Sequence, residues 1–265
     1  MRLYFAFIPL SAAAVGFYLT GHKPSLSRAV ISAIIVFFGW GIHQIVNDLT
    51  GIEADKINAP ERPICSNALD KRFTVTITAF LALAGLLISL SLSLPTGVIY
   101  LIVFAVNLIY DELKKFFLGN AAFAALIALC VYYGAFCSNN ALDSFYRQKL
   151  FLASIGVGVI NFTFAFLTDF KDAPGDKAAG VKNIVTAYGL VKARQFIPFY
   201  LCVQFFAVLI FLKSAGHHLS LIVYPALFMA ATAAIFSLRD IYQNKYSTKW
   251  PLIEVVLLQT AMLLA

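Results

Sequence analysis

Charged residues are scarce in this sequence. Only 12% of its 265 residues are Asp, Glu, Lys or Arg, whereas an ordinary soluble domain is about a quarter charged. Hydrophobic residues make up 61%, and the mean hydropathy is +0.83. A water-soluble monomer of this composition would expose a large apolar surface, which soluble proteins avoid. The composition excludes a soluble enzyme, a disordered tail and a collagen-like fibre, and it indicates a polytopic membrane protein.

Cysteine is also sparse, and long basic runs are missing. There are four cysteines and no Cys-x-x-Cys, and Cys130, Cys137 and Cys202 stand in apolar runs, where cysteine behaves as a small hydrophobe. This pattern gives no case for a disulfide framework, a zinc site or a cysteine nucleophile. The net charge of +7 comes without a long basic run, so we expect no nucleic-acid partner.

Nine apolar stretches approach the ~20 residues that a membrane-spanning helix needs. The N-terminal stretch resembles a secretory signal, but everything after it is also membrane-type, so we interpret it as a first spanning helix. We therefore expect one integral-membrane domain over residues 1–265. The expected spans are roughly 3–20, 28–46, 74–92, 96–110, 119–136, 150–167, 196–213, 219–237 and 251–265. The fourth is short and the ninth stops at the last residue, which leaves open whether the natural chain continues.

Charge is distributed unevenly between the two sides of this bundle. With nine spans, 15 of the 20 lysines and arginines fall on the side of the N-terminus and the even-numbered loops. The positive-inside rule makes that side cytosolic. Ten of the 13 acids lie in three loops of this same side. We expect the functional loops to be cytosolic.

Two acidic segments carry the sharpest pattern: residues 47–55 after the second span, and residues 169–176 after the sixth. Each segment contains two aspartates that are seven residues apart. Because seven residues are close to two helical turns, each pair can face the same way. The recurrence four spans later predicts a bundle of two four-helix repeats around a central apolar chamber.

Carboxylates at the end of a membrane helix are costly and mark function by default. Helix-end acids can simply meet water, but two matched segments favour a shared role. Several close carboxylates repel one another unless a cation intervenes, and hard oxygen ligands suit Mg²⁺, which also binds substrate phosphates.

Basic side chains lie among these acids. Arg62 follows the first segment, Lys114 and Lys115 stand in the fourth loop, and Lys177 and Lys182 follow the second segment. Arginine holds phosphate oxygens bidentately and lysine acts as a point charge. The combination predicts a Mg²⁺-bridged diphosphate inside an apolar bundle, and an isoprenyl diphosphate is the kind of molecule that needs both.

Three segments together resemble the UbiA superfamily of intramembrane prenyltransferases. They are NDLTGIEADKINAPERPICS (47–66), YDELKKFFLGN (110–120) and DFKDAPGDKAAGVKNIVTAYG (169–189). The first is similar to the family's Asn-Asp-x-x-Asp-x-x-x-Asp motif with its following Asn-x-Pro-x-Arg-Pro. The third is similar to its Asp-x-x-Asp-x-x-Gly-Asp motif. The resemblance covers essentially the whole chain.

The resemblance implies ionisation of an allylic prenyl diphosphate and transfer of the prenyl group to an aromatic or lipid-like acceptor, with Mg²⁺ as cofactor and membrane lipids as surroundings. The implied metal ligands are Asn47, Asp48, Asp55, Asp169, Asp172 and Asp176, of which Asp48, Asp55, Asp172 and Asp176 are the catalytic set. The implied substrate-binding residues are Arg62, Tyr110, Lys114, Asn120 and Lys177.

The sequence departs from the family pattern at three positions. Gly51 replaces the second aspartate of the first motif, Pro174 stands where the family often has Glu, and Thr168 stands where Lys is common. These departures leave the number of metal ions and the nature of the acceptor open.

Several alternatives follow from the same residues. A terpene cyclase would use the same site without an acceptor, and a transporter or lipid-binding scaffold would use it without chemistry. His43, one turn before Asn47, is either a base toward an acceptor or a packed histidine of the helix interior. Because residues 162, 164 and 166 alternate around a helix, we expect that these three phenylalanines do not all face the chamber.

Overall fold

The computed structural model describes residues 3–20, 25–138, 144–214 and 223–264, and within these ranges the protein is helical without strands. The helices are η1 (Leu3–Ala6), α1 (Phe7–Leu19), α2 (Leu26–Thr50), α3 (Ile52–Asn58), α4 (Lys71–Leu92), α5 (Leu94–Lys114), α6 (Gly119–Ser138), α7 (Ser144–Ala178), α8 (Ile184–Ala193), η2 (Arg194–Phe196), α9 (Ile197–Ser214), α10 (Val223–Tyr242) and α11 (Lys249–Leu263).

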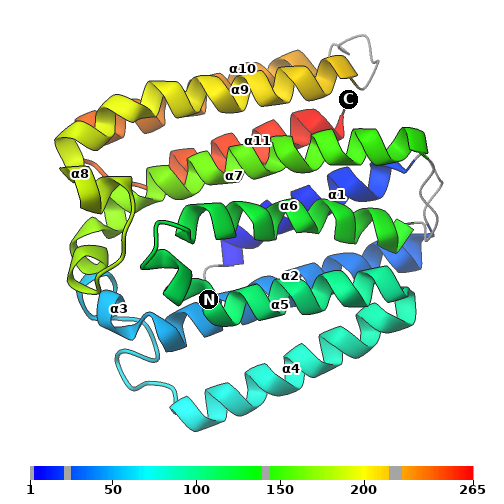
Figure 1. The fold of residues 1–265 in the computed structure, drawn as a ribbon, viewed down its shortest axis with the longest axis horizontal. Helices are drawn as coiled ribbons and strands as arrows, with labels where there is room; N and C mark the ends of the chain where they lie inside the picture. The colour runs from blue at the N-terminus through cyan, green and yellow to red at the C-terminus, as the bar shows by residue number, and fades with distance from the viewer. Residues whose placement is uncertain (1–2, 21–24, 139–143, 215–222, 265) are drawn as a thin grey trace.

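The long helices run roughly side by side in successive rows (Figure 1). From bottom to top in that view, α4 is followed by α5 with α2, by α6 with α1, by α7 with α11, and by α9 with α10. The short helices α3 and α8 both lie at the left end, α3 beside the ends of α2 and α7 and α8 beside the ends of α7 and α9. Segments from both halves of the chain therefore meet at one end of the bundle.

Each of the nine expected spans overlaps one of these helices, although α1 and α11 have only 13 and 15 residues. The expected start at residue 219 and the expected end at residue 265 lie outside the described residues. Six helical stretches in the described part of the chain meet the length and hydropathy that a membrane crossing requires. The expectation of an all-helical membrane protein is confirmed. The arrangement as nine crossings in two repeats is not established by these helices alone.

Large apolar side chains cover the outside of the bundle, as expected for a protein surrounded by lipid rather than water. On α4, Phe73, Phe80 and Leu87 are 61%, 67% and 59% exposed at intervals of two turns. A helix face with these exposed apolar side chains is unfavourable in water but favourable in contact with lipid chains.

Small residues let α1 and α6 approach closely. A Cβ added to Gly16 would lie 1.7 Å from the Val131 carbonyl oxygen, and one added to Gly134 would lie 1.9 Å from the Ala13 carbonyl oxygen. Close backbone contact at small residues is a common way for membrane helices to associate. This crossing fixes the central layer against which α2 and α7 pack.

Candidate active site

The first acidic segment is divided between two helices. Helix α2 ends at Thr50, Gly51 has non-helical backbone angles, and α3 begins at Ile52. Asp48 and Asp55 therefore stand on two helices and not on successive turns of one, although both carboxylates face the same arginine. Arg62 brings them together instead, because its Nη1 donates to Asp48 Oδ1 at 2.8 Å and also to Asp55 Oδ2.

The second acidic segment is helical throughout. Helix α7 continues to Ala178 and contains Pro174 in its interior. Asp169, Asp172 and Asp176 therefore stand on successive turns of one helix, as their spacing predicts. Asn120 Nδ2 donates to Asp169 Oδ2 at 2.8 Å. Asp176 Oδ2 accepts from the side-chain amide of Asn183 at 3.2 Å.

Asn58 joins the two segments. Its Nδ2 donates to the Asp172 carbonyl oxygen at 2.7 Å, and its Oδ1 accepts from the Gly175 backbone N–H at 2.9 Å. A Cβ at Gly175 would lie 2.4 Å from the Ala54 carbonyl oxygen. The contact between α3 and α7 thus requires a residue without a side chain at this position.

Lys114 lies between the two segments. Its Nζ donates to Asn47 Oδ1 at 3.0 Å and to Asp111 Oδ1 at 2.5 Å, and it stands 4.5 Å from the centre of the Tyr110 ring. The backbone N–H of Lys182 donates to the Lys114 carbonyl oxygen at 2.9 Å. These contacts connect the ends of α2 and α5 with the turn after α7.

Burial shapes the electrostatics of the first segment. Asp55 is 7% exposed, and burial raises the pKa of its carboxyl group, while the charge of Arg62 opposes the rise. Burial also raises the pKa of the Cys65 thiol. Arg62 therefore stabilises two carboxylates that would otherwise repel each other at close range.

Three adjoining cavities pass from this end into the bundle. The outer polar cavity is lined by both acidic segments together with Arg62 and Lys114. The inner polar cavity shares Asn47, Lys114, Asp172, Asp176 and Val181 with it. The apolar cavity meets the inner one at Trp40, His43 and Phe123.

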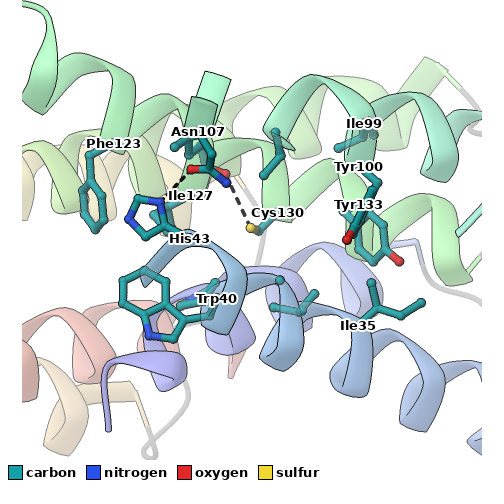
Figure 2. Close-up of a pocket in the computed structure, with 15 residues that line it drawn as sticks. Ile35, Trp40, His43, Ile99, Tyr100, Asn107, Phe123, Ile127, Cys130 and Tyr133 are labelled. Carbon is teal, nitrogen blue, oxygen red and sulfur yellow. Dashed lines mark hydrogen bonds between the residues drawn. The ribbon is translucent and has the colours of Figure 1, made fainter. Parts of the chain in front are cut away.

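The apolar cavity lies between α2, α5 and α6 (Figure 2). His43, Trp40 and Phe123 stand at one end of it, and Ile35, Tyr100 and Tyr133 stand at the other. Phe164 lines the inner polar cavity, whereas Phe162 lines a shallow groove and Phe166 is packed in a separate cluster. The expectation that these phenylalanines do not all face one chamber is confirmed.

Most of the residues that the sequence singled out lie in this region. Those that line a polar cavity are Asn47, Asp55, Arg62, Tyr110, Lys114, Asn120, Asp169, Asp172 and Asp176. Asp48 joins them through Arg62. Lys177 is exposed and is not part of either cavity lining, while Lys182 lines the inner one.

Sequence reasoning missed several participants. Asn58 belongs to the quoted Asn-x-Pro-x-Arg-Pro segment, so its position in that motif was a usable signal. Thr50 donates to Asp111 Oδ2, which closes a contact between α2 and α5. Asn107 accepts from His43 across the apolar cavity. The last two pairs are 61 and 64 residues apart in the chain, and no sequence spacing indicates them.

The carboxylate groups are suitable ligands for a hard divalent cation whose remaining ligands come from the substrate. Among the described residues, no three His, Cys, Asp or Glu side chains converge to form a metal site by themselves. Mg²⁺ needs only one or two carboxylates when phosphate oxygens and water complete its shell. Carboxylate and amide oxygens around an open polar cavity fit that requirement.

A family model and several known proteins are similar to this chain. The model of the UbiA prenyltransferase family matches residues 7–260. Two similar curated proteins are digeranylgeranylglyceryl phosphate synthases. That of Thermococcus gammatolerans is 28% identical over 185 residues, covering 68% of this chain and 64% of the relative. That of Saccharolobus solfataricus is 30% identical over 173 residues, covering 63% and 59%. These alignments span about three fifths of the relatives' length.

Solved structures share the fold. A UbiA homologue from Aeropyrum pernix in its apo form has a TM-score of 0.84 at 16% identity, with 100% of this chain and 98% of the other covered. A UbiA homologue from Archaeoglobus fulgidus bound to DMAPP and Mg²⁺ has a TM-score of 0.71 at 15% identity, with 99% and 96% covered. The family model covers most of the chain, and the chain belongs to the UbiA prenyltransferase family.

Proposed function

We propose that this protein transfers a prenyl group from a prenyl diphosphate to a lipid-like acceptor in the membrane. The inner polar cavity, which is lined by charged side chains, continues into the apolar cavity, and this continuity is the main support for the proposal. A prenyl diphosphate matches these two cavities, because its diphosphate head is highly charged and its tail is a hydrocarbon. Family membership and the names of the similar curated synthases support this assignment.

The head of the substrate would bind between the acidic segments. Lys114 and Arg62 line the outer polar cavity and supply the positive charge that diphosphate oxygens need. Asn120 and Tyr110 line the inner polar cavity, near the start of the prenyl chain. Arg62 is already paired with Asp48 and Asp55, so binding of the head exchanges one set of charge contacts for another.

Mg²⁺ is the proposed cofactor, held by oxygen atoms of Asn47, Asp48, Asp55, Asp169, Asp172 and Asp176. When bound, it would neutralise charge that develops on the leaving diphosphate.

The tail would occupy the apolar cavity. This cavity follows α2 from His43 to Ile35, which is about 12 Å of helix. An isoprene unit has four backbone bonds, and extended-chain geometry makes it about 4–5 Å long. The cavity therefore holds about two to three units beyond the junction with the inner polar cavity.

The reaction begins with breakage of the allylic C–O bond, whose electron pair leaves with the diphosphate. The carbocation forms where the inner polar cavity meets the apolar cavity, beside Trp40, Phe123 and Phe164. Aromatic faces stabilise a cation by several tenths of a kcal/mol to about 2 kcal/mol when water is excluded. Attack by the acceptor then forms the new bond, and the acceptor loses a proton.

We further propose that residues 1–265 form one integral-membrane domain with nine crossings in two four-helix repeats. The acidic segments and α3 and α8 would face the cytosol. The uneven distribution of lysine and arginine supports this orientation. An accessibility assay on single cysteines placed at Glu53 and at Arg147 tests it, because labelling of both from the same side of sealed vesicles would contradict the proposal.

Product analysis tests the function itself. The purified protein would be incubated with Mg²⁺ and dimethylallyl, geranyl, farnesyl or geranylgeranyl diphosphate, each with and without geranylgeranylglyceryl phosphate as acceptor. We expect diphosphate release and an acceptor-bound prenyl product. A cyclic hydrocarbon or terpene alcohol formed without acceptor would identify a cyclase instead. Absence of diphosphate release with every substrate would favour a scaffold or transporter.

A further inference from the structure

His43 stands at the boundary between the inner polar cavity and the apolar cavity and lines both. It is 7% exposed, so the residue is packed as well as cavity-lining. Trp40 and Phe123 line the same two cavities. His43 is therefore the only imidazole among the described residues that line these cavities, and the surrounding wall at this depth is aromatic.

The imidazole ring is held in one orientation. His43 Nδ1 lies 2.6 Å from Asn107 Oδ1, and Asn107 is itself 5% exposed (Figure 2). The ring centre lies 5.1 Å from that of Trp40, 5.6 Å from that of Tyr110 and 6.2 Å from that of Phe123. With Asn107 Oδ1 as acceptor, the hydrogen is on Nδ1, and Nε2 keeps the basic lone pair.

The depth of His43 matches the expected position of the reacting carbon. His43 precedes Asn47 by four residues on α2, which is about 6 Å along the helix axis. Asn47 contacts Lys114, the cation that would bind the diphosphate. A head group at Lys114 with its tail in the apolar cavity therefore brings the first carbon of the prenyl chain to the level of His43.

The other polar groups near this level have different partners. Asp111 accepts from Lys114 and Thr50, Lys114 also contacts Asn47, and Asp169 on α7 accepts from Asn120. Lys114 Nζ lies 4.5 Å from the centre of the Tyr110 ring, and its positive charge disfavours uptake of a proton by the Tyr110 hydroxyl. Cys130 on α6 donates to its own helix. His43 is the neutral nitrogen base among these groups.

We propose that His43 is a catalytic residue that accepts the proton of an acceptor hydroxyl, with Asn107 as its positioning residue. This inference rests on the proposed function and deepens it by assigning the acceptor class. The allylic C–O bond breaks and its electron pair leaves with the diphosphate. The hydroxyl oxygen forms the new C–O bond, and its proton moves to His43 Nε2, from which solvent removes it.

The test separates ionisation from transfer. Wild type and the His43→Gln and Asn107→Ala variants would be supplied with geranylgeranyl diphosphate, Mg²⁺ and geranylgeranylglyceryl phosphate. Diphosphate release and prenyl ether formation would be measured together. Ser32→Ala is a matched control, because Ser32 is a buried polar residue of α2 that lines none of the three cavities.

We expect His43→Gln to keep diphosphate release within about twofold and to lose about 100-fold in ether formation, the scale of general-base catalysis. Geranylgeraniol from capture by water should replace the ether. Asn107→Ala should shift the product ratio in the same direction but less, and Ser32→Ala should keep the wild-type ratio. A variant that has merely lost structure would lose both readouts together.

Three results would overturn the inference. The first is an unchanged ratio of ether to diphosphate in His43→Gln. The second is an equal loss of both readouts in His43→Gln and Asn107→Ala. The third is diphosphate release by wild type without any ether from this hydroxyl acceptor. Failure of wild type to release diphosphate with any prenyl diphosphate is a different result, because it removes the proposed function itself.

Discussion

The side-chain amide of Asn58 donates to the Asp172 carbonyl oxygen at 2.7 Å and joins the helices that carry the two acidic segments. The same side chain accepts from Gly175 N–H at 2.9 Å. One amide therefore fixes α3 against α7 through two hydrogen bonds. The relative position of the acidic segments depends on a residue that carries no charge.

Replacing Asn58 with Leu should separate the acidic segments without changing their charge. The two lost hydrogen bonds correspond to about 1–3 kcal/mol, since their partly buried partners lose an acceptor and a donor. We expect a lower rate of diphosphate release and a higher Mg²⁺ concentration at half-maximal rate, measured by magnesium titration. Gln195→Leu, on an exposed residue of η2, is the control. Equal Mg²⁺ dependence in Asn58→Leu and wild type would contradict this role.

Asp172→Ala and Asp48→Ala should each abolish diphosphate release while the protein remains folded. Both carboxylates are oxygen ligands for the proposed cation, and neither anchors a helix end by capping. Release would be measured in detergent, and folding by thermal unfolding of the same samples. Asp240→Ala on α10 removes an acid that lines none of the three cavities and should retain activity. Turnover by both site variants would eliminate the proposed metal site.

Filling the apolar cavity at Gly39 should change the preferred chain length. Gly39 lines this cavity, and a Cβ added there would meet nothing within 4 Å. Gly39→Phe should therefore fold and still use dimethylallyl diphosphate, but lose most activity with geranylgeranyl diphosphate. The ratio of kcat/KM for the two substrates measures the effect. Gly39→Ala should change this ratio little, and an unaltered ratio in Gly39→Phe would place the tail elsewhere.

The crossing of α1 and α6 should depend on glycine at position 134. A Cβ there would lie 1.9 Å from the Ala13 carbonyl oxygen, so Gly134→Ala must push the helices apart. Overpacking of this kind costs about 1–3 kcal/mol, and Tm in detergent should fall. The matched Gly39→Ala variant has open space and should have an equal or higher Tm, because alanine is favoured in helices. Equal Tm changes in the two variants would argue against a close crossing.

Arg62→Met should make stability depend on pH. Burial already raises the pKa of Asp55, and loss of the opposing charge would raise it further. The folded state would then hold a proton that the unfolded chain releases above a pKa of about 3.9. Stability should therefore fall as pH rises from about 4 toward neutrality, where loss of a buried partner costs about 3 kcal/mol.

Thermal unfolding of wild type and Arg62→Met at about pH 4 and about pH 7 measures this difference. The two proteins should be closer in Tm at the lower pH. Addition of Mg²⁺ should recover part of the loss at neutral pH, since a cation replaces the missing charge. A Tm difference that is the same at both pH values would show that Arg62 contributes through packing rather than charge.

Much of the fold and site followed from local properties of the chain. Apolar stretches predicted the long helices, because burying backbone hydrogen bonds in lipid requires helices of this length. The spacing of Asp169 and Asp176 predicted a shared face, and α7 provides it. Asp48 and Asp55 have the same spacing but stand on two helices, because Gly51 interrupts the helix between them, and Arg62 is what joins their carboxylates. Periodicity alone does not reveal such a break.

Composition and residue spacing act over a few turns of chain, and they predict a helical protein that is apolar on its outside and carries two acidic segments. They do not predict that Asn58 joins those segments, that Lys177 lies outside both polar cavities, or that His43 meets Asn107. A helical pattern specifies which face is apolar or polar, whereas packing between helices selects the neighbour that this face contacts.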